Sequence, residues 1–440
     1  MSLFRQIFVL RFSWVFVILG FVMALGQMPF DLPLLTVLSF ICLGWLWSII
    51  DFKEFNAFIW GFSLGLGYFT LTFFWIIEPF LVSPTETGLL APFALVGLVG
   101  ILSLIWAAAF YFASIIGKGK GNGSRLLILW AVFSLSELVR SEWLADFPWG
   151  LISSIWINTS IGQSLSIFGP YWLSSLTILM AFFFLISRVT LFLGLIIVGL
   201  SYGYGEIRLD SDPLERLNPI KVRLVQPNVK QSEKWKPEFA RKFLDRQLNL
   251  SKESDLKDID LVVWPETAIS YLVGDDKEIV RHISETLGVP VLLGARRLEA
   301  KKLYNSAFLF GRSGAINNIY DKTILVPFGE YIPFAKFFAK LGIFGLASDG
   351  ILGFSVGKSK QIFGLEDLQS FMILICYEAI FPEKVNNMAN DASWIVQITN
   401  DAWFGDFNGP QQHFALARMR TIEQGLPLVR VANTGISAMI

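Results

Sequence analysis

Residues 261–266 read Leu-Val-Val-Trp-Pro-Glu, a short apolar run that ends at a proline and an acidic side chain. Similar runs recur beyond Pro219 and alternate with charged, amphipathic stretches, a pattern that indicates an α/β domain with a largely buried sheet. The predicted strands are Val222–Val225, Leu261–Trp264, Val289–Leu293, Ser306–Phe310, Phe371–Ile375, Trp394–Ile398 and Leu428–Val431. The predicted helices are Pro237–Leu250, Lys277–Leu287, Pro382–Asn390 and Gln411–Gln424.

The rest of the chain has a different composition. Of the 36 basic and 36 acidic residues in this chain of 440, residues 1–205 hold only 8 of each, while 54% of all residues are hydrophobic. We therefore predict a membrane domain over residues 1–205, a linker over 206–218 and a water-soluble α/β domain over 219–440. The zero net charge and the two cysteines speak against a nucleic-acid partner, a disulfide scaffold and a multi-cysteine metal site.

Seven apolar stretches predict about seven membrane helices, because most approach the ~20 residues needed to cross ~30 Å of hydrocarbon. The fifth and seventh are short for this purpose. The stretches are Ile7–Leu25, Leu32–Ile50, Phe58–Ile77, Leu89–Ile116, Leu126–Leu138, Tyr171–Ile186 and Thr190–Tyr204.

The basic residues of the short loops predict the orientation. If the N-terminus is cytoplasmic, the outer loops between spans carry only Arg140. The inner segments then carry Arg5, Lys53, Lys118, Lys120, Arg125 and Arg188. An odd number of spans places the α/β domain outside the cytoplasm.

Three reactive side chains stand at the ends of strand-like runs: Glu266, Lys322 and Cys376. The run before Lys322 is Ile316–Tyr320, followed by Asp321. Taken singly, each has an ordinary explanation, as a loop carboxylate, a solvated lysine and a small buried residue. Together they form a coherent set for nucleophilic catalysis. A carboxylate can accept the thiol proton, a lysine can stabilise the thiolate and an oxyanion, and the backbone N–H of Tyr377 can donate to the same oxyanion.

Several segments together resemble the carbon–nitrogen hydrolase (nitrilase) superfamily and, more closely, the bacterial apolipoprotein N-acyltransferase family. The resemblance includes the multi-span half and covers nearly the whole chain. The segments are Trp264-Pro265-Glu266-Thr267, Tyr320-Asp321-Lys322, Leu325-Val326-Pro327-Phe328-Gly329-Glu330-Tyr331, Cys376-Tyr377-Glu378 and Thr399-Asn400-Asp401-Ala402-Trp403-Phe404-Gly405.

The resemblance implies a nitrilase-like α-β-β-α sandwich and a two-step acyl transfer without cofactor or metal. A phospholipid gives an acyl chain to Cys376 as a thioester, and the α-amino group of a diacylglyceryl-modified apolipoprotein cysteine then accepts it. Glu266 acts as the base and Lys322 stabilises the tetrahedral intermediate.

Further positions carry supporting roles by the same resemblance. Glu330 supports the lysine, and Tyr377 and Glu378 surround the nucleophile. Trp235 and Trp403 resemble positions on mobile loops near the lipid entrance, and the adjacent Phe404 is apolar enough to touch lipid, although core packing explains it equally well.

Two charged segments can be interpreted without a role in the reaction, although the first also has a functional interpretation. Trp149 follows Glu137 and Arg140, so this segment is either a set of paired charges with an interfacial aromatic anchor or the rim of a lipid portal. Arg420 and Glu423 lie three residues apart on a predicted helix and are expected to form an ion pair.

Two alternative functions remain open from the sequence: a membrane-anchored amidase that uses the same three residues with water, and a non-catalytic membrane protein that kept the fold. Family members usually carry a final transmembrane helix after the soluble domain. Because this chain stops at Ile440, its C-terminus is expected to be truncated.

Overall fold

The computed structural model describes residues 2–50, 54–144, 146–211, 219–273, 278–332, 353–358, 362–365 and 368–440. The chain divides into two compact units. The first comprises Met1–Ile77, Thr87–Pro213 and Phe407–Glu423, and the second comprises Glu78–Glu86, Leu214–Asp406 and Gln424–Ile440. The predicted linker at 206–218 begins within a helix, and its residues 212–218 lie outside the described residues.

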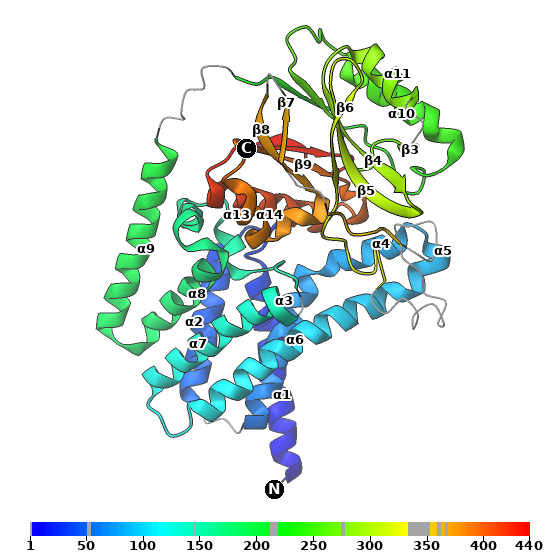
Figure 1. The fold of residues 1–440 in the computed structure, drawn as a ribbon. Coiled ribbons are helices and arrows are strands. Elements are labelled where there is room, and N and C mark those ends of the chain that lie inside the picture. Colours follow the sequence, from blue (N-terminus) through cyan, green and yellow to red (C-terminus); the bar gives the residue numbers. More distant parts are fainter. Residues whose placement is uncertain are drawn as a thin grey trace. The chain divides into compact units, whose positions relative to one another are not determined.

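Long helices form most of the first unit (Figure 1). They are α1 (Ser2–Ala24), α2 (Pro33–Ile49), α3 (Glu54–Thr72), α6 (Ala91–Ile116), α7 (Asn122–Val139), α8 (Leu165–Ile186) and α9 (Arg188–Leu209). Within the described residues, three helical stretches are long and apolar enough to cross a membrane: Pro84–Ile116, Ser160–Ile186 and Arg188–Leu209. Several apolar helices are thus compatible with a membrane domain, and the count of seven spans stays a prediction.

The third predicted span, Phe58–Ile77, was expected to be one continuous helix, and this is wrong. Helix α3 ends at Thr72, and the chain bends by 65° into the segment Phe74–Leu81. The helix end is stabilised from far along the sequence, because Asn408 Nδ2 donates to the carbonyl of Leu71 at 2.8 Å and Gln412 Nε2 to that of Thr72 at 3.1 Å. These bonds satisfy carbonyls that a helix end leaves open, and hydropathy cannot reveal them.

The helices observed at the fifth and seventh predicted spans are longer than the apolar runs from which those spans were predicted. Helix α7 has 18 residues and α9 has 22, because both include polar ends that hydropathy trims. At the start of α7, Arg125 donates to the carbonyls of Trp47 and Ile50 at 3.0 and 3.1 Å. At the start of α9, Ser187 and Thr190 form a reciprocal capping box.

Helix α14 (Gly409–Gln424) lies late in the sequence but packs almost entirely within the first unit. Gln412 is its main polar attachment: Trp149 Nε1 donates to its Oε1 at 2.8 Å, and its Nε2 also donates to Met28 O at 3.0 Å. The predicted Arg420–Glu423 ion pair is confirmed, with an N···O separation of 2.6 Å.

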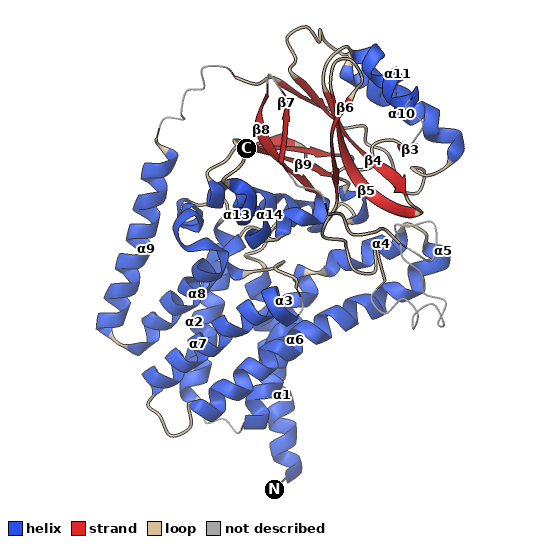
Figure 2. Cartoon of the chain, in the orientation of Figure 1, coloured by secondary structure: helices blue, strands red, loops and turns tan. Residues whose placement is uncertain are grey.

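The described residues of the second unit form two β-sheets (Figure 2). In the first, strands run in the order β1-β2-β4-β5-β6, and β3 also pairs with β4. In the second, the order is β11-β10-β9-β8-β7. The strands are β1 (Val222–Leu224), β2 (Leu261–Val263), β3 (Leu272–Val273), β4 (Val291–Glu299), β5 (Lys302–Phe310), β6 (Ile316–Asp321), β7 (Ile362–Leu365), β8 (Leu368–Ile375), β9 (Trp394–Thr399), β10 (Leu428–Ala432) and β11 (Ala438–Met439).

Helices α10 (Pro237–Ser251) and α11 (Glu278–Leu287) pack on the first sheet, and α13 (Pro382–Ala389) lies near the second (Figure 2). Leu248 of α10 and Ile283 of α11 share one buried core with Val262 and Val291 of the sheet. The seven strands and four helices predicted beyond Pro219 are all present with shifted ends, although one of these helices, α14, packs in the first unit. Strand β6 was expected only as the run Ile316–Tyr320 before Lys322. The strands β3, β7 and β11 were not predicted, because two to four residues are too short for a periodic signal.

Candidate active site

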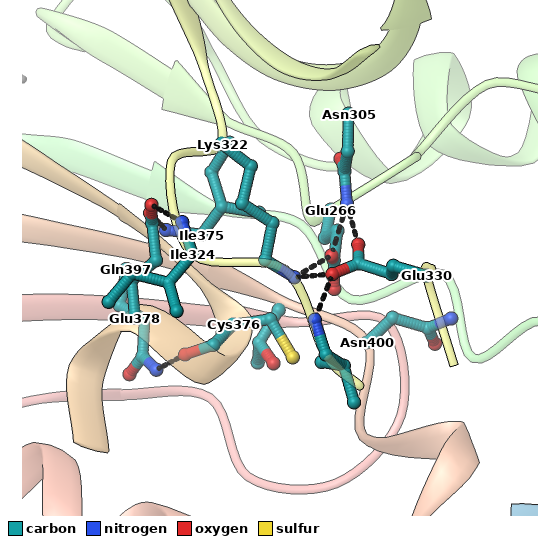
Figure 3. Close-up of polar contacts among 12 residues, drawn as sticks. Glu266, Asn305, Lys322, Ile324, Glu330, Ile375, Cys376, Glu378, Gln397 and Asn400 are labelled. Atoms are coloured by element: carbon teal, nitrogen blue, oxygen red, sulfur yellow. Dashed lines mark hydrogen bonds and ion pairs between the residues drawn. The ribbon is translucent and has the colours of Figure 1, made fainter. Parts of the chain in front are cut away.

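Three strand ends bring the predicted reactive residues into one buried cluster (Figure 3). Glu266 follows β2, Lys322 follows β6 and Cys376 follows β8, and all three are buried. Lys322 Nζ lies 3.4 Å from Glu266 Oε1. The Cys376 thiol interacts electrostatically with both of these side chains. Residues more than fifty positions apart are therefore assembled by the two sheets.

Lys322 is held between two carboxylates. Its Nζ lies 2.9 Å from Glu330 Oε2, closer than to Glu266. Asn305 of β5 joins the two carboxylates, because its Nδ2 donates to Glu266 Oε1 at 2.7 Å and to Glu330 Oε1 at 2.9 Å. The backbone N–H of Val326 donates to Glu330 Oε2 at 2.9 Å. This arrangement fixes the lysine ammonium and both carboxylates in one orientation.

The charges and burial of the cluster favour a charged Lys322 and a neutral Cys376 thiol. Burial alone lowers the pKa of Lys322, but Glu330 and Glu266 together raise it above its ordinary value, so the ammonium stays charged. Burial raises the pKa of the Cys376 thiol; Glu266 adds to the rise and Lys322 opposes it. The resting cysteine is therefore a neutral thiol that needs a base before it can attack.

The backbone is strained at the site. Cys376 has a φ of 51°, Thr267, next to Glu266, has 44°, and Phe328, two residues before Glu330, has 61°. Non-glycine residues seldom adopt this left-handed region, and such residues persist where the surrounding structure holds them, often at functional sites. At Cys376, Gln397 Nε2 donates to the residue's own carbonyl at 3.0 Å and helps to hold this conformation.

Glu378 connects the loop that carries Cys376 with the loop that carries Lys322. Its Oε2 accepts from the N–H of Ile375 at 2.8 Å, and its Oε1 accepts from the N–H of Thr323 at 2.8 Å. Tyr320 Oη also donates to Oε1 at 2.5 Å. Since Ile375 precedes Cys376 and Thr323 follows Lys322, one buried carboxylate sets the spacing of the two loops.

The aromatic candidates lie in different places. Trp235 is half-buried and stacks under the Arg296 guanidinium, 3.9 Å from the ring centre. Trp403 is half-buried on a short helix, Asp401–Trp403, whereas Phe404 and Tyr377 are buried. Trp149 belongs to the other compact unit and is buried there. Lipid contact by these residues remains a prediction.

Sequence reasoning missed several residues of the site. Asn305 adjoins a predicted strand but lies just outside it, and Lys234 precedes Trp235 in a polar loop. Both are buried here, and Lys234 Nζ donates to the backbone carbonyl of Glu266 at 3.2 Å. Neither residue carries a local pattern that separates it from a solvated loop residue. Among the described residues, no group of three or more His, Cys, Asp or Glu side chains is arranged to hold a metal ion.

Comparison with known proteins identifies the class. Residues 221–440 match the carbon–nitrogen hydrolase family, and residues 19–183 match the N-terminal domain of apolipoprotein N-acyltransferase. A carbon–nitrogen hydrolase from Helicobacter pylori aligns with 50% of this chain and 74% of its own at 18% identity and a TM-score of 0.37. The family match over residues 221–440 makes the second unit a nitrilase-like domain of the carbon–nitrogen hydrolase class.

Full-length relatives narrow the assignment. The apolipoprotein N-acyltransferase of Brucella suis is 35% identical over 404 residues, which cover 86% of this chain and 75% of that protein. The apolipoprotein N-acyltransferase of Agrobacterium fabrum is 34% identical over 451 residues, covering 96% and 84%. The chain belongs to the apolipoprotein N-acyltransferase family, and it is an acyltransferase.

Proposed function

We propose that this acyltransferase moves a fatty acyl chain from a phospholipid to the α-amino group of a diacylglyceryl-modified cysteine at the N-terminus of an apolipoprotein. The acyl chain passes through a thioester on Cys376. The observation that carries this proposal is the buried cluster itself, with Lys322 3.4 Å from Glu266 and 2.9 Å from Glu330, and with Cys376 in electrostatic contact with Glu266 and Lys322.

In the first half-reaction, the Glu266 carboxylate takes the proton of the Cys376 thiol. The thiolate attacks the ester carbonyl carbon of the phospholipid, and a C–S bond forms. The ammonium of Lys322 stabilises the oxyanion of this tetrahedral intermediate. When the C–O bond breaks, the lysophospholipid oxygen takes the proton back from Glu266.

In the second half-reaction, the neutral α-amine attacks the thioester carbonyl, and a C–N bond forms. Glu266 accepts the proton that the amine loses, and the C–S bond breaks as the thiolate leaves. Protonation of the thiolate by Glu266 restores the enzyme. An α-amino group has a pKa near ~8, so an appreciable neutral fraction is present around neutral pH.

We also propose that the enzyme is a multi-pass protein of the bacterial inner membrane, with its catalytic domain on the periplasmic side. The asymmetry of Lys and Arg between the loops supports this orientation. Both substrates carry acyl chains, so a catalyst held at the membrane meets them by lateral diffusion and does not need to extract them.

Mass spectrometry of the detergent-purified protein after incubation with phospholipid tests the mechanism. The expected result is a mass gain of one acyl chain on the peptide that contains Cys376, lost when a diacylglyceryl lipopeptide is added. Cys376→Ala is expected to abolish both the adduct and the transfer. Cys42→Ala is the matched control, because this other cysteine lies in α2 of the first unit.

The same experiment separates the alternatives. An adduct that water discharges as fast as the lipopeptide does would favour a membrane-anchored amidase or hydrolase with the same Glu266, Lys322 and Cys376. Transfer that persists in Cys376→Ala would contradict the thioester route.

A further inference from the structure

A second lysine lies at the site besides Lys322. Lys234 belongs to the loop between β1 and α10, and only 3% of its surface is exposed. Its Nζ donates to the backbone carbonyl of Glu266 at 3.2 Å, and it interacts electrostatically with the Glu266 carboxylate and with Cys376. A lysine is seldom buried to this extent unless its charge has a partner or a task.

The loop that carries Lys234 is attached on both sides of the site. Ser270 Oγ donates to the carbonyl of Lys234 at 2.6 Å, which ties the loop to the segment after Glu266. Asn400 Nδ2 donates to Gln231 Oε1 at 2.7 Å, which ties it to the segment after β9. These contacts anchor the loop, and the bond from Nζ to the Glu266 carbonyl anchors the Lys234 side chain at the site.

The two lysines of the site have opposite electrostatic environments. The carboxylates of Glu330 and Glu266 keep Lys322 charged. Burial lowers the pKa of Lys234 to about 7; Arg296 adds to the fall, while Glu266 and Cys376 oppose it. Lys234 can therefore gain and lose its proton around neutral pH, as groups with distinct acid–base roles in one site do.

We propose that Lys234 is a positioning residue for acyl transfer: it holds the backbone of Glu266 in place and adds a positive charge that favours the thiolate of Cys376. The inference rests on the proposed role of Cys376 as the nucleophile. The positive charge of Lys234 acts in addition to that of Lys322, which the carboxylates of Glu266 and Glu330 neutralise.

The test is the rate at which iodoacetamide alkylates Cys376, measured by peptide mass spectrometry in a Cys42→Ala background. This rate reports the thiolate without any lipid. Lys234→Met removes the charge and keeps the aliphatic bulk, and Lys234→Arg keeps a charge that does not titrate. Lys236→Met is the matched control, because Lys236 is an exposed lysine of the same loop.

At about pH 6, where Lys234 is charged, Lys234→Met is expected to slow alkylation about tenfold, equivalent to about one unit of thiol pKa. At about pH 9, where wild-type Lys234 is neutral, that difference is expected to shrink. Lys234→Arg is expected to match wild type at the lower pH and to exceed it at the higher one. Phospholipid-dependent adduct formation is expected to fall in parallel for Lys234→Met.

Two results would overturn the inference. One is a Lys234→Met rate equal to that of Lys236→Met at both pH values. The other is a slowing that is independent of pH and that Lys234→Arg does not rescue, since that result indicates packing alone. Failure of the proposed function shows itself separately, as transfer that survives Cys376→Ala, because alkylation rates do not depend on lipid chemistry.

Discussion

Lys322 Nζ lies 2.9 Å from Glu330 Oε2, and both side chains are buried. Glu266 lies farther away, at 3.4 Å, and in the proposed mechanism it is the carboxylate that gains and loses a proton. Whenever Glu266 is protonated, Glu330 still neutralises the lysine. The buried Lys322 ammonium therefore keeps a carboxylate partner throughout the proposed cycle.

Glu330→Gln should accordingly lower transfer by at least about tenfold and also lower the thermal stability, because removing one partner of a buried pair costs about 3–5 kcal/mol. The amide nitrogen also places a donor either beside the Val326 N–H and the Lys322 ammonium or beside Asn305 Nδ2. Activity and thermal unfolding of the purified variant check this. Glu238→Gln, at an exposed site on α10, is the control and should change neither. Unchanged activity in Glu330→Gln would show that Glu266 alone balances the lysine.

Glu378→Gln should slow formation of the Cys376 adduct more than its loss of stability explains. The carboxylate accepts hydrogen bonds from the N–H groups of Ile375 and Thr323, so an amide nitrogen on either side meets a donor. Leaving one buried donor unsatisfied costs about 1–3 kcal/mol and shifts one of the two loops. The measurement is the adduct rate per folded molecule, with the folded fraction taken from urea unfolding. A variant that is less stable but reacts at the wild-type rate would contradict a role in spacing the loops.

The sequence could predict those parts of the fold and site that have a local signal. Strand cores and amphipathic helices were predictable because their periodicity is written in consecutive residues. Glu266, Lys322 and Cys376 were predictable as candidates because reactive side chains at strand ends tend to gather at one edge of a sheet. Glu330 and Glu378 entered only through the resemblance to a family.

Other features depend on partners that the sequence does not reveal. The break after Thr72 is satisfied by Asn408 and Gln412, more than three hundred residues away. Arg430 lies inside a predicted apolar strand, where the sequence shows an unexplained charge and the structure shows an ion pair with Asp401. Lys234 resembles any loop lysine until the fold buries it. In each case the contacts of the residue in the folded protein decide its role, and the neighbouring sequence does not predict those contacts.

Gly294→Ala should displace Glu266, the proposed general base. A Cβ at Gly294 of β4 comes within 2.6 Å of both Pro265 O and Thr267 N and within 2.7 Å of Glu266 Cα. All three atoms are backbone, so the Glu266 segment must move to relieve the overlap. A displacement near ~1 Å can cost about 10² in rate. Lipopeptide transfer assays check this, and Gly364→Ala, where a Cβ meets nothing within 4 Å, is the control and should keep full activity. Wild-type activity in Gly294→Ala would show that the base tolerates displacement.

The ion pair between Arg430 Nη2 and Asp401 Oδ2, at 2.7 Å and fully buried, gives the last prediction. Arg430 Nη1 also donates to Gln397 Oε1, and Gln397 in turn donates to the carbonyl of Cys376. The pair thus supports the Gln397 amide, which holds the strained backbone of Cys376, the proposed nucleophile.

Arg430→Met and Asp401→Asn are each expected to destabilise the protein by about 3–5 kcal/mol, since each leaves the other charge buried without its partner. The double variant is expected to lose less than the sum of the two, by about 0.5–3 kcal/mol in a double-mutant cycle measured by urea unfolding. Arg241→Met breaks the exposed Arg241–Asp245 pair and should cost no more than about 1 kcal/mol. In the folded fraction, Arg430→Met should also slow alkylation of Cys376, because Gln397 loses a donor that orients its amide. Additive losses in the cycle, or alkylation at the wild-type rate, would show that the buried pair does not act on the nucleophile.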